Sequence, residues 1–171
     1  MRRRIVSLLA ATLLVLLSAL PAAARGPERF WLTPEEILFG PEYCGFPVLL
    51  EDSFSSVKVM VFPPDGGGNQ RIIQSGLFKS RLTNLADTAQ SIALNLGGKI
   101  TIYFGADGTV RFEGSGTILL WYSPAEAAVS ELGAGLFLAH GRATERYGPA
   151  GNLVEATYTG RVTDLCAQLA G

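Results

Sequence analysis

A strict alternation of apolar and polar side chains in two neighbouring segments constrains the fold most. In residues 92–104 the even positions are apolar or glycine: Ile92, Leu94, Leu96, Gly98, Ile100, Ile102 and Phe104. Residues 110–122 repeat the pattern with Val110, Phe112, Gly114, Gly116, Ile118, Leu120 and Tyr122. A period of two gathers one set of side chains on one face of a strand, whereas a helix would distribute it around its axis. Both segments are therefore predicted to be β-strands.

The four residues between these segments predict a tight hairpin. Ala106 and Asp107 suit a type I turn, and Gly108 suits the left-handed residue that closes such a loop. The turn pairs Gly105 with Thr109. Counting back from it places Phe104 opposite Val110, Gly98 opposite Gly116, and Leu94 opposite Leu120. Both apolar sets then share one face, so the turn and the pattern agree.

Five further segments alternate in the same way and are separated by turn residues: Val48–Glu51, Val57–Phe62, Arg71–Leu82, Leu136–Tyr147 and Leu153–Val162. Short connections favour an antiparallel meander of about seven or eight strands. Closure removes exposed edges, so we expect an all-β fold closed into a small, lipocalin-like barrel. Helical turns are predicted at Thr33–Phe39, after Ser123, and after Asp164, because each begins with a capping residue.

The first 24 residues have the pattern of a secretory signal peptide. Three arginines precede an apolar stretch, and small residues follow at Ala22–Ala24. The stretch is short for a membrane span, and no later segment is suited to one. We therefore expect a secreted protein, extracellular or associated with the cell wall. Residues 25–46 are interpreted as an N-terminal extension with a short helical turn, and residues 47–171 as the β-barrel domain.

The chain has two cysteines, Cys44 and Cys166. In an oxidising compartment an isolated pair is most simply one disulfide, which would join the start of the domain to its last residues. A free reactive thiol or a metal site is the weaker alternative, because two distant cysteines and one histidine make a poor ligand set. We predict no metal and no cofactor.

The charge balance bears on possible partners. The arginines at positions 2–4 leave with the signal, so eleven basic side chains remain against fifteen acidic ones. Nucleic-acid binding and docking on anionic lipid both need a basic surface. A net negative chain therefore argues against both partners.

A polar cluster is the candidate site within the predicted barrel. His140 is the single histidine, and a register with Gly148 opposite Asn152 sets His140 against Gly160 and Arg142 against Tyr158. An inward-facing His140, Arg142 and Tyr158 cluster would orient a carboxylate or a carbonyl. Alternatively the opposite face, with Phe137, is buried and His140 is exposed. A one-residue bulge would exchange the two faces.

Other strand residues have two readings each. Six glycines interrupt the strands, and they mark either bends or room for a ligand: Gly76, Gly98, Gly114, Gly116, Gly141 and Gly160. Three glutamates, Glu113, Glu145 and Glu155, are predicted to pair with strand arginines on a solvated face, such as Arg111, Arg142 and Arg161.

Several short motifs resemble a group of secreted actinobacterial proteins of unknown role. They are Cys44-Gly45-Phe46-Pro47-Val48, Ser80-Arg81-Leu82-Thr83-Asn84-Leu85, Gly135-Leu136-Phe137-Leu138 with Gly141-Arg142, and Val162-Thr163-Asp164-Leu165-Cys166. The similarity covers most of the exported chain, and both cysteines lie inside the shared motifs. It implies secretion and a disulfide, and it carries over no active site.

Three functions follow from these expectations. A non-enzymatic module binding a small apolar or amphipathic ligand in the barrel is favoured, by analogy with lipocalin-like folds. The second is a barrel isomerase, cyclase or hydrolase that uses His140, Arg142 and Tyr158, although no catalytic motif supports it. The third is a structural or protein-interaction module of the cell envelope.

Overall fold

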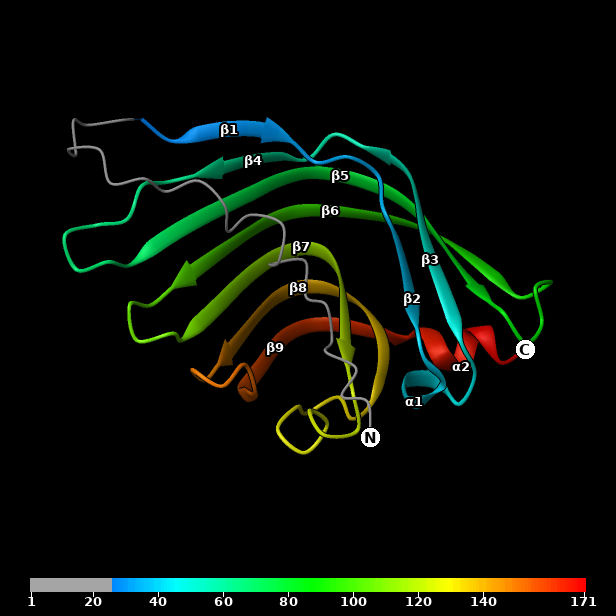
Figure 1. Ribbon diagram of the computed structural model, residues 1–171. Coiled ribbons are helices and arrows are strands. Elements are labelled where there is room, and N and C mark those ends of the chain that lie inside the picture. The colour runs from blue at the N-terminus through cyan, green and yellow to red at the C-terminus, as the bar shows by residue number, and fades with distance from the viewer. Residues whose placement is uncertain (1–25) are drawn as a thin grey trace, which may run out of the picture.

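The computed structural model describes residues 26–171, and the predicted signal peptide lies outside the described residues. Its strands form one antiparallel sheet (Figure 1). They are β1 (Glu28–Trp31), β2 (Glu36–Phe39), β3 (Val48–Ser55), β4 (Lys58–Val61), β5 (Gln70–Asn84), β6 (Ser91–Phe104), β7 (Val110–Tyr122), β8 (Gly135–Tyr147) and β9 (Leu153–Asp164). Two short helices are α1 (Pro41–Cys44) and α2 (Leu165–Leu169). Among residues 26–171, no helix has the length and apolar character needed to cross a membrane.

The predicted meander is confirmed, except that on one side of β5 the neighbouring strands are short and interrupted. Strands β5 to β9 are neighbours in chain order. Strand β5 is bordered on its other side by both β3 and β4, which pair with its two halves. Strands β2 and β1 border β3 and β4 in the same way. β3 and β4 together therefore take the place of one long, broken strand beside β5, and β2 and β1 together take the next place.

The helical turn predicted at Thr33–Phe39 is wrong, because Glu36–Phe39 forms β2. Pairing sets Phe39 opposite Val48, and both side chains are buried in one core. Burial of an aromatic ring in the sheet outweighs a local capping signal. The helical turn comes slightly later, as α1, which begins at Pro41 and ends at Gly45 with a φ of 80°. The predicted cap at Asp164 is confirmed, since its side chain accepts a hydrogen bond from the Ala167 amide at 3.0 Å.

A row of five glycines crosses the sheet. Gly76, Gly98, Gly116, Gly141 and Gly160 lie directly opposite one another on β5 to β9. Their φ angles lie between 112° and 158°, a region that other residues rarely adopt. A Cβ at Gly98 would collide with the carbonyl oxygen of Ser115, and one at Gly141 with that of Thr159. The row is therefore a crease where only glycine fits.

The crease bends the sheet into an arch. A Cβ built on Gly114 would lie 3.0 Å from Cδ1 of Ile118, four residues further along the same strand. An extended strand would separate such positions by about 13 Å. The strands curve over the segment between β7 and β8 (Figure 1). We call the concave side of the arch, which carries Gly114 and Ile118, the inner face, and the convex side the outer face. The bending role predicted for the strand glycines thus holds for the five in the row.

The sheet is not closed into a barrel, and that prediction is wrong. Strands β6 and β7 pair only over Gly97–Phe104 and Val110–Thr117, and then diverge. Leu94 is therefore not opposite Leu120: the two residues lie in different cores. Strand pairing at the crease stops where the sharp bend carries the two strands apart. The rest of the predicted hairpin register, including Phe104 opposite Val110, is confirmed.

Where β6 and β7 have separated, the sheet divides into two wings, one of β1 to β6 and one of β7 to β9. The short helices and a disulfide join these two wings. Cys44 at the end of α1 is bonded to Cys166 in α2, with their Cα atoms 5.1 Å apart. The buried residues of this core come from both wings and from α2: Phe39, Val48, Leu50, Leu82, Leu94, Leu136, Leu165 and Leu169. The predicted disulfide is confirmed, and it does the joining that barrel closure was expected to do.

Candidate functional site

One row of side chains crosses the outer face beside the hairpin turns. Successive pairings set Arg71 opposite Tyr103, Tyr103 opposite Arg111, and Arg111 opposite Arg146. Residues directly opposite in a sheet share a face and lie close together. Arg71 and Arg111 thus lie on either side of the Tyr103 ring, and Arg146 lies one strand beyond Arg111.

These side chains line a shallow hollow of about 600 Å³, which we call the arginine hollow. Phe62 and Pro63 complete its apolar part. The Arg71 guanidinium carbon lies 4.2 Å from the centre of the Phe62 ring, and that of Arg111 lies 4.4 Å from the centre of the Tyr103 ring. Such stacking holds the guanidinium planes against the rings and leaves their N–H edges free to bind.

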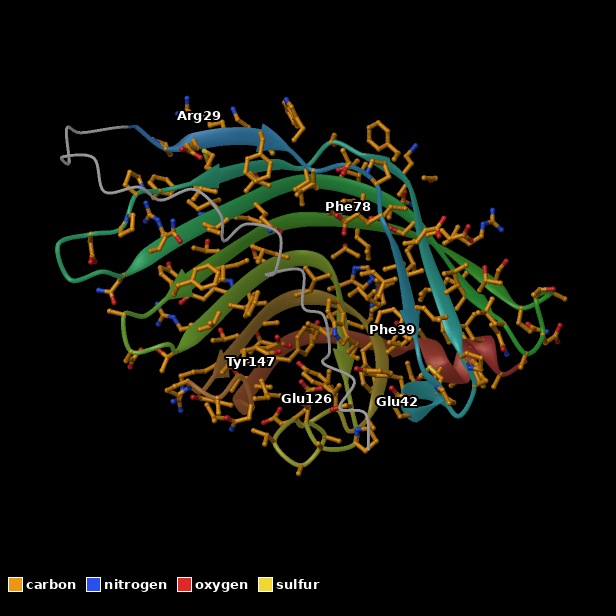
Figure 2. All side chains as sticks on the ribbon, in the orientation of Figure 1. Arg29, Phe39, Glu42, Phe78, Glu126 and Tyr147 are labelled. Carbon is orange, nitrogen blue, oxygen red and sulfur yellow. A yellow bond between two sulfur atoms is a disulfide. The ribbon has the colours of Figure 1, made fainter. Side chains whose placement is uncertain are left out.

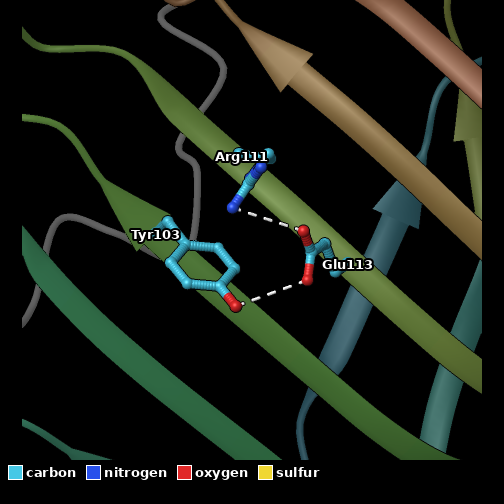
Figure 3. Close-up of polar contacts among 3 residues, drawn as sticks. All are labelled: Tyr103, Arg111 and Glu113. Carbon is cyan, nitrogen blue, oxygen red and sulfur yellow. Dashed lines mark hydrogen bonds and ion pairs between the residues drawn. The ribbon is translucent and has the colours of Figure 1, made fainter.

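Glu113 orders one side of the site. Its carboxylate is 3.3 Å from an Arg111 guanidinium nitrogen and accepts a hydrogen bond from the Tyr103 hydroxyl at 3.3 Å (Figure 3). Arg146 pairs with Glu155 at 3.1 Å, and both of these ion pairs are about half exposed. Exposed pairs contribute at most about 1 kcal/mol, so a ligand anion can displace them. Within residues 26–171, no carboxylate lies within 4.0 Å of the Arg71 guanidinium.

Two hairpin turns form the rim of the hollow. Asn69 of the first turn accepts a hydrogen bond from the Ala106 amide of the second at 3.2 Å. Asp65 accepts hydrogen bonds from Asn69 and Gly67, which lower the pKa of its carboxyl. The Asp107 carboxyl has a lowered pKa because Thr109 donates to it. Both aspartates remain charged and hold their turns in a fixed shape.

The predicted His140, Arg142 and Tyr158 cluster is divided between two faces. A bulge between Arg146 and Tyr147 shifts the register by one residue, so Arg142 lies opposite Thr159 and Tyr158 opposite Ala143. The predicted pairings of His140 with Gly160 and Arg142 with Tyr158 are therefore wrong. Tyr158 is on the inner face, where its hydroxyl donates to the Arg161 carbonyl at 2.7 Å.

His140 and Arg142 lie on the outer face. The Nδ1 atom of His140 is 3.0 Å from the Thr117 hydroxyl oxygen. Arg142 lines a second, smaller hollow with Lys99 and Thr144. The alternative in which the Phe137 side of β8 is buried is the one that the structure shows, since Phe137 and Ala139 are both buried.

A buried carboxyl on the inner face was missed by the sequence analysis. Glu145 accepts hydrogen bonds from the hydroxyls of Tyr122 at 2.8 Å and Tyr147 at 3.1 Å. Its predicted pairing with a strand arginine is wrong, because the register places it among apolar residues. For the other two glutamates the prediction is confirmed, since Glu113 pairs with Arg111 and Glu155 with Arg146, both on strands and about half exposed. The sequence did contain a signal for the buried Glu145 carboxyl. Tyr122 and Tyr147 occupy apolar positions of their strands, and a buried tyrosine hydroxyl needs a hydrogen-bond partner.

Burial dominates the titration of this cluster. It raises the pKa of the Glu145 carboxyl, although the two donated hydrogen bonds act in the opposite direction. Burial, and then the charge of Glu145, raise the pKa values of Tyr122 and Tyr147. Glu126, which lies under the arch near Tyr147 (Figure 2), adds a like charge that also raises the pKa of Glu145. The Glu145 carboxyl therefore ionises at a higher pH in the folded protein than in the unfolded chain.

Glu145→Gln is expected to remove a pH-dependent cost from the folded state. The raised pKa of Glu145 means that the unfolded chain ionises first as the pH rises above the ordinary value of 4.5. The free energy of unfolding of the wild type should fall from there up to the folded-state pKa, and then level off. The glutamine variant should lack this fall. Its free energy of unfolding minus that of the wild type should therefore rise with pH. Urea unfolding at pH 4, 5, 6 and 7 measures it, and a constant gap would contradict the assignment.

The structure gives no metal site within residues 26–171, where no three His, Cys, Asp or Glu side chains are placed to hold an ion. Comparisons with known proteins give no match to a family model, to a curated protein or to a solved structure. A functional assignment therefore depends on the geometry and charge of the chain itself.

Proposed function

We propose that this chain is an exported binding protein that holds a small amphipathic anion in the arginine hollow. The observation that carries the proposal is the placement of Arg71 and Arg111 on either side of Tyr103, with Arg146 and Phe62 in the same hollow. Export is supported by the signal-like first 24 residues and by the disulfide, which persists in oxidising compartments. The proposed binding site is on the outer face of the sheet. The inner face is filled by apolar side chains.

The two chemical parts of the hollow suit the two ends of such a ligand. Guanidinium groups donate paired hydrogen bonds to a carboxylate, sulfonate or phosphate, and Arg71 and Arg111 present theirs from strands on either side of Tyr103. The apolar end would lie on Phe62, Pro63 and the Tyr103 ring. The order imposed by the two turns at the rim reduces the entropy lost on binding.

The Arg71→Ala/Arg111→Ala variant is expected to lose affinity for the fluorescent sulfonate anilinonaphthalene sulfonate. Each charge-assisted hydrogen bond is worth about 1.5–3 kcal/mol, so the dissociation constant should rise at least tenfold. The measurement is a fluorescence titration of the folded protein at low ionic strength. N-phenyl-1-naphthylamine, a neutral molecule of similar shape, is the matched probe and should bind much more weakly to the wild type.

The control variant changes the net charge by the same amount away from the hollow. Thr88→Glu and Ala128→Glu are both exposed and lie outside the lining of the hollow. This double variant should bind the sulfonate within about twofold of wild type, because distant surface charges are screened. Equal losses in both variants, or equal binding of the neutral probe, would contradict the proposal.

A further inference from the structure

The basic side chains of the described residues gather on one face of the sheet. All ten lysines and arginines in residues 26–171 have outer-face register positions: Arg29, Lys58, Arg71, Lys79, Arg81, Lys99, Arg111, Arg142, Arg146 and Arg161. Arg29 is seen on the upper side of the arch in Figure 2. The only carboxylates on that face within these residues are Glu36, Glu51, Glu113 and Glu155. The other eleven acidic residues lie on the inner face, in turns and in the helical segments.

The outer face is therefore a basic surface on an acidic protein. The net charge of the whole chain also counts the acidic residues of the inner face, the turns and the helical segments, and so conceals this basic face. Only Arg111 and Arg146 are within ion-pair distance of a carboxylate in the described part of the chain. Eight cations on one sheet face are left to attract an external anion.

We propose that the outer face is a docking surface for a linear acidic polysaccharide. Seven of its ten cations are arginines, whose fork of N–H groups fits a carboxylate or a sulfate. The positions between them are rich in hydroxyl side chains: Ser75, Ser115, Thr117, Thr144, Thr157 and Thr159. Hydroxyls suit a partner that carries many hydroxyl groups of its own. Trp31 is 65% exposed opposite Lys58 and offers a flat ring on which a sugar can stack.

The curvature of the sheet favours a flexible chain over a membrane or a duplex. Lys79 and Arg81 lie on one side of the glycine crease, and Arg71, Arg111 and Arg146 lie on the other. A planar membrane touches a convex arch along its crest and cannot reach both limbs at once. A rigid nucleic-acid duplex is itself convex and meets the face along a narrow line. A single flexible polymer can follow the face across the crease.

The test uses residues outside the arginine hollow, so that it is independent of the proposed small-ligand site. The test variant is Lys99→Gln/Arg142→Gln/Arg161→Gln, which removes three charges near the crease. Its control, Thr88→Glu/Ala128→Glu/Gln168→Glu, makes the same change in net charge at exposed positions off the outer face. Binding of the folded full exported chain to alginate, a linear polymer of uronic acids, is measured by calorimetry between 50 and 200 mM salt.

The wild type is expected to bind alginate, with an affinity that falls as salt rises. The test variant should bind at least tenfold more weakly, and the control should stay within about twofold of wild type. Absence of alginate binding at 50 mM salt would overturn the proposal. So would equal losses in the two triple variants, or equally tight binding to duplex DNA or to phosphatidylglycerol vesicles. The Arg71→Ala/Arg111→Ala titration with the small sulfonate reports separately on the arginine hollow.

Discussion

Gly98→Ala and Gly141→Ala are each expected to abolish folding at physiological temperature. The φ angles at these positions are 154° and 158°, and the new Cβ would enter the backbone of the next strand. Backbone atoms in a paired sheet cannot move aside without breaking ladder hydrogen bonds on both strands. We expect each substitution to cost more than about 4 kcal/mol, a large part of the 5–15 kcal/mol that holds a typical domain together. Circular dichroism and urea unfolding of the purified proteins measure the loss.

Two other glycines serve as matched controls for this prediction. Gly97 is adjacent to Gly98, but the nearest atom to a Cβ there would be the end of the flexible Leu77 side chain at 3.1 Å, and the nearest backbone atom would be at the ordinary contact distance of 3.4 Å. Gly97→Ala should change stability by less than about 1 kcal/mol. Gly151 has a φ of 77° in a turn with open space around it, so Gly151→Ala isolates conformational strain and should cost about 1–2 kcal/mol. Stable, native-like Gly98→Ala protein would show that the crease tolerates side chains.

Replacing both cysteines, as Cys44→Ala/Cys166→Ala, is expected to lower the free energy of unfolding by about 4–5 kcal/mol on the chain-entropy estimate for a loop this long. The bonded residues are 122 positions apart in the chain. The disulfide lies where β6 and β7 no longer pair, so the two wings lose their covalent link at the place where hydrogen bonds do not join them. Urea unfolding of the oxidised wild type and of the variant measures the difference.

Hydrogen exchange locates the effect of the missing disulfide. Amides in α2 and in the part of β6 beyond the crease should exchange faster in the double-cysteine variant. Amides in the paired region of β6 and β7, next to the turn that ends in Gly108, should keep their protection. Reductant provides the control, because it should destabilise the wild type and leave the variant unchanged. Equal stabilities of the two proteins would contradict a joining role for this bond.

The sequence predicted most strands because their signals are local. Alternation located β5 to β9, and the Gly105–Gly108 turn set the register between β6 and β7. The errors share one cause, which is competition from distant contacts. The capping signal at Thr33–Glu36 was outweighed by burial of Phe39 in the sheet, and the bulge in β9 opposite Tyr147 set Tyr158 opposite Ala143 instead of Arg142.

The candidate site was less predictable than the strands. The residues of the arginine hollow come from β5, β6, β7 and β8, which are separated by long stretches of chain. A pairing error of one residue on any strand reverses the face of every side chain that follows. The predicted His140, Arg142 and Tyr158 cluster failed in this way, while each of its residues was correctly placed on a strand.

The amino-acid sequence by itself determined the strands β3 to β9, the hairpin turn between β6 and β7, the helix cap at Asp164 and the pairing of the two cysteines, because each depends on neighbouring residues or on composition. The tertiary structure decided the arch, the open sheet and the collection of every described lysine and arginine on one face. These depend on how five glycines align across strands, and on where a steep bend ends the pairing of β6 with β7. Alignment across a sheet is a property of many distant pairings at once, and a local pattern of residues does not contain it.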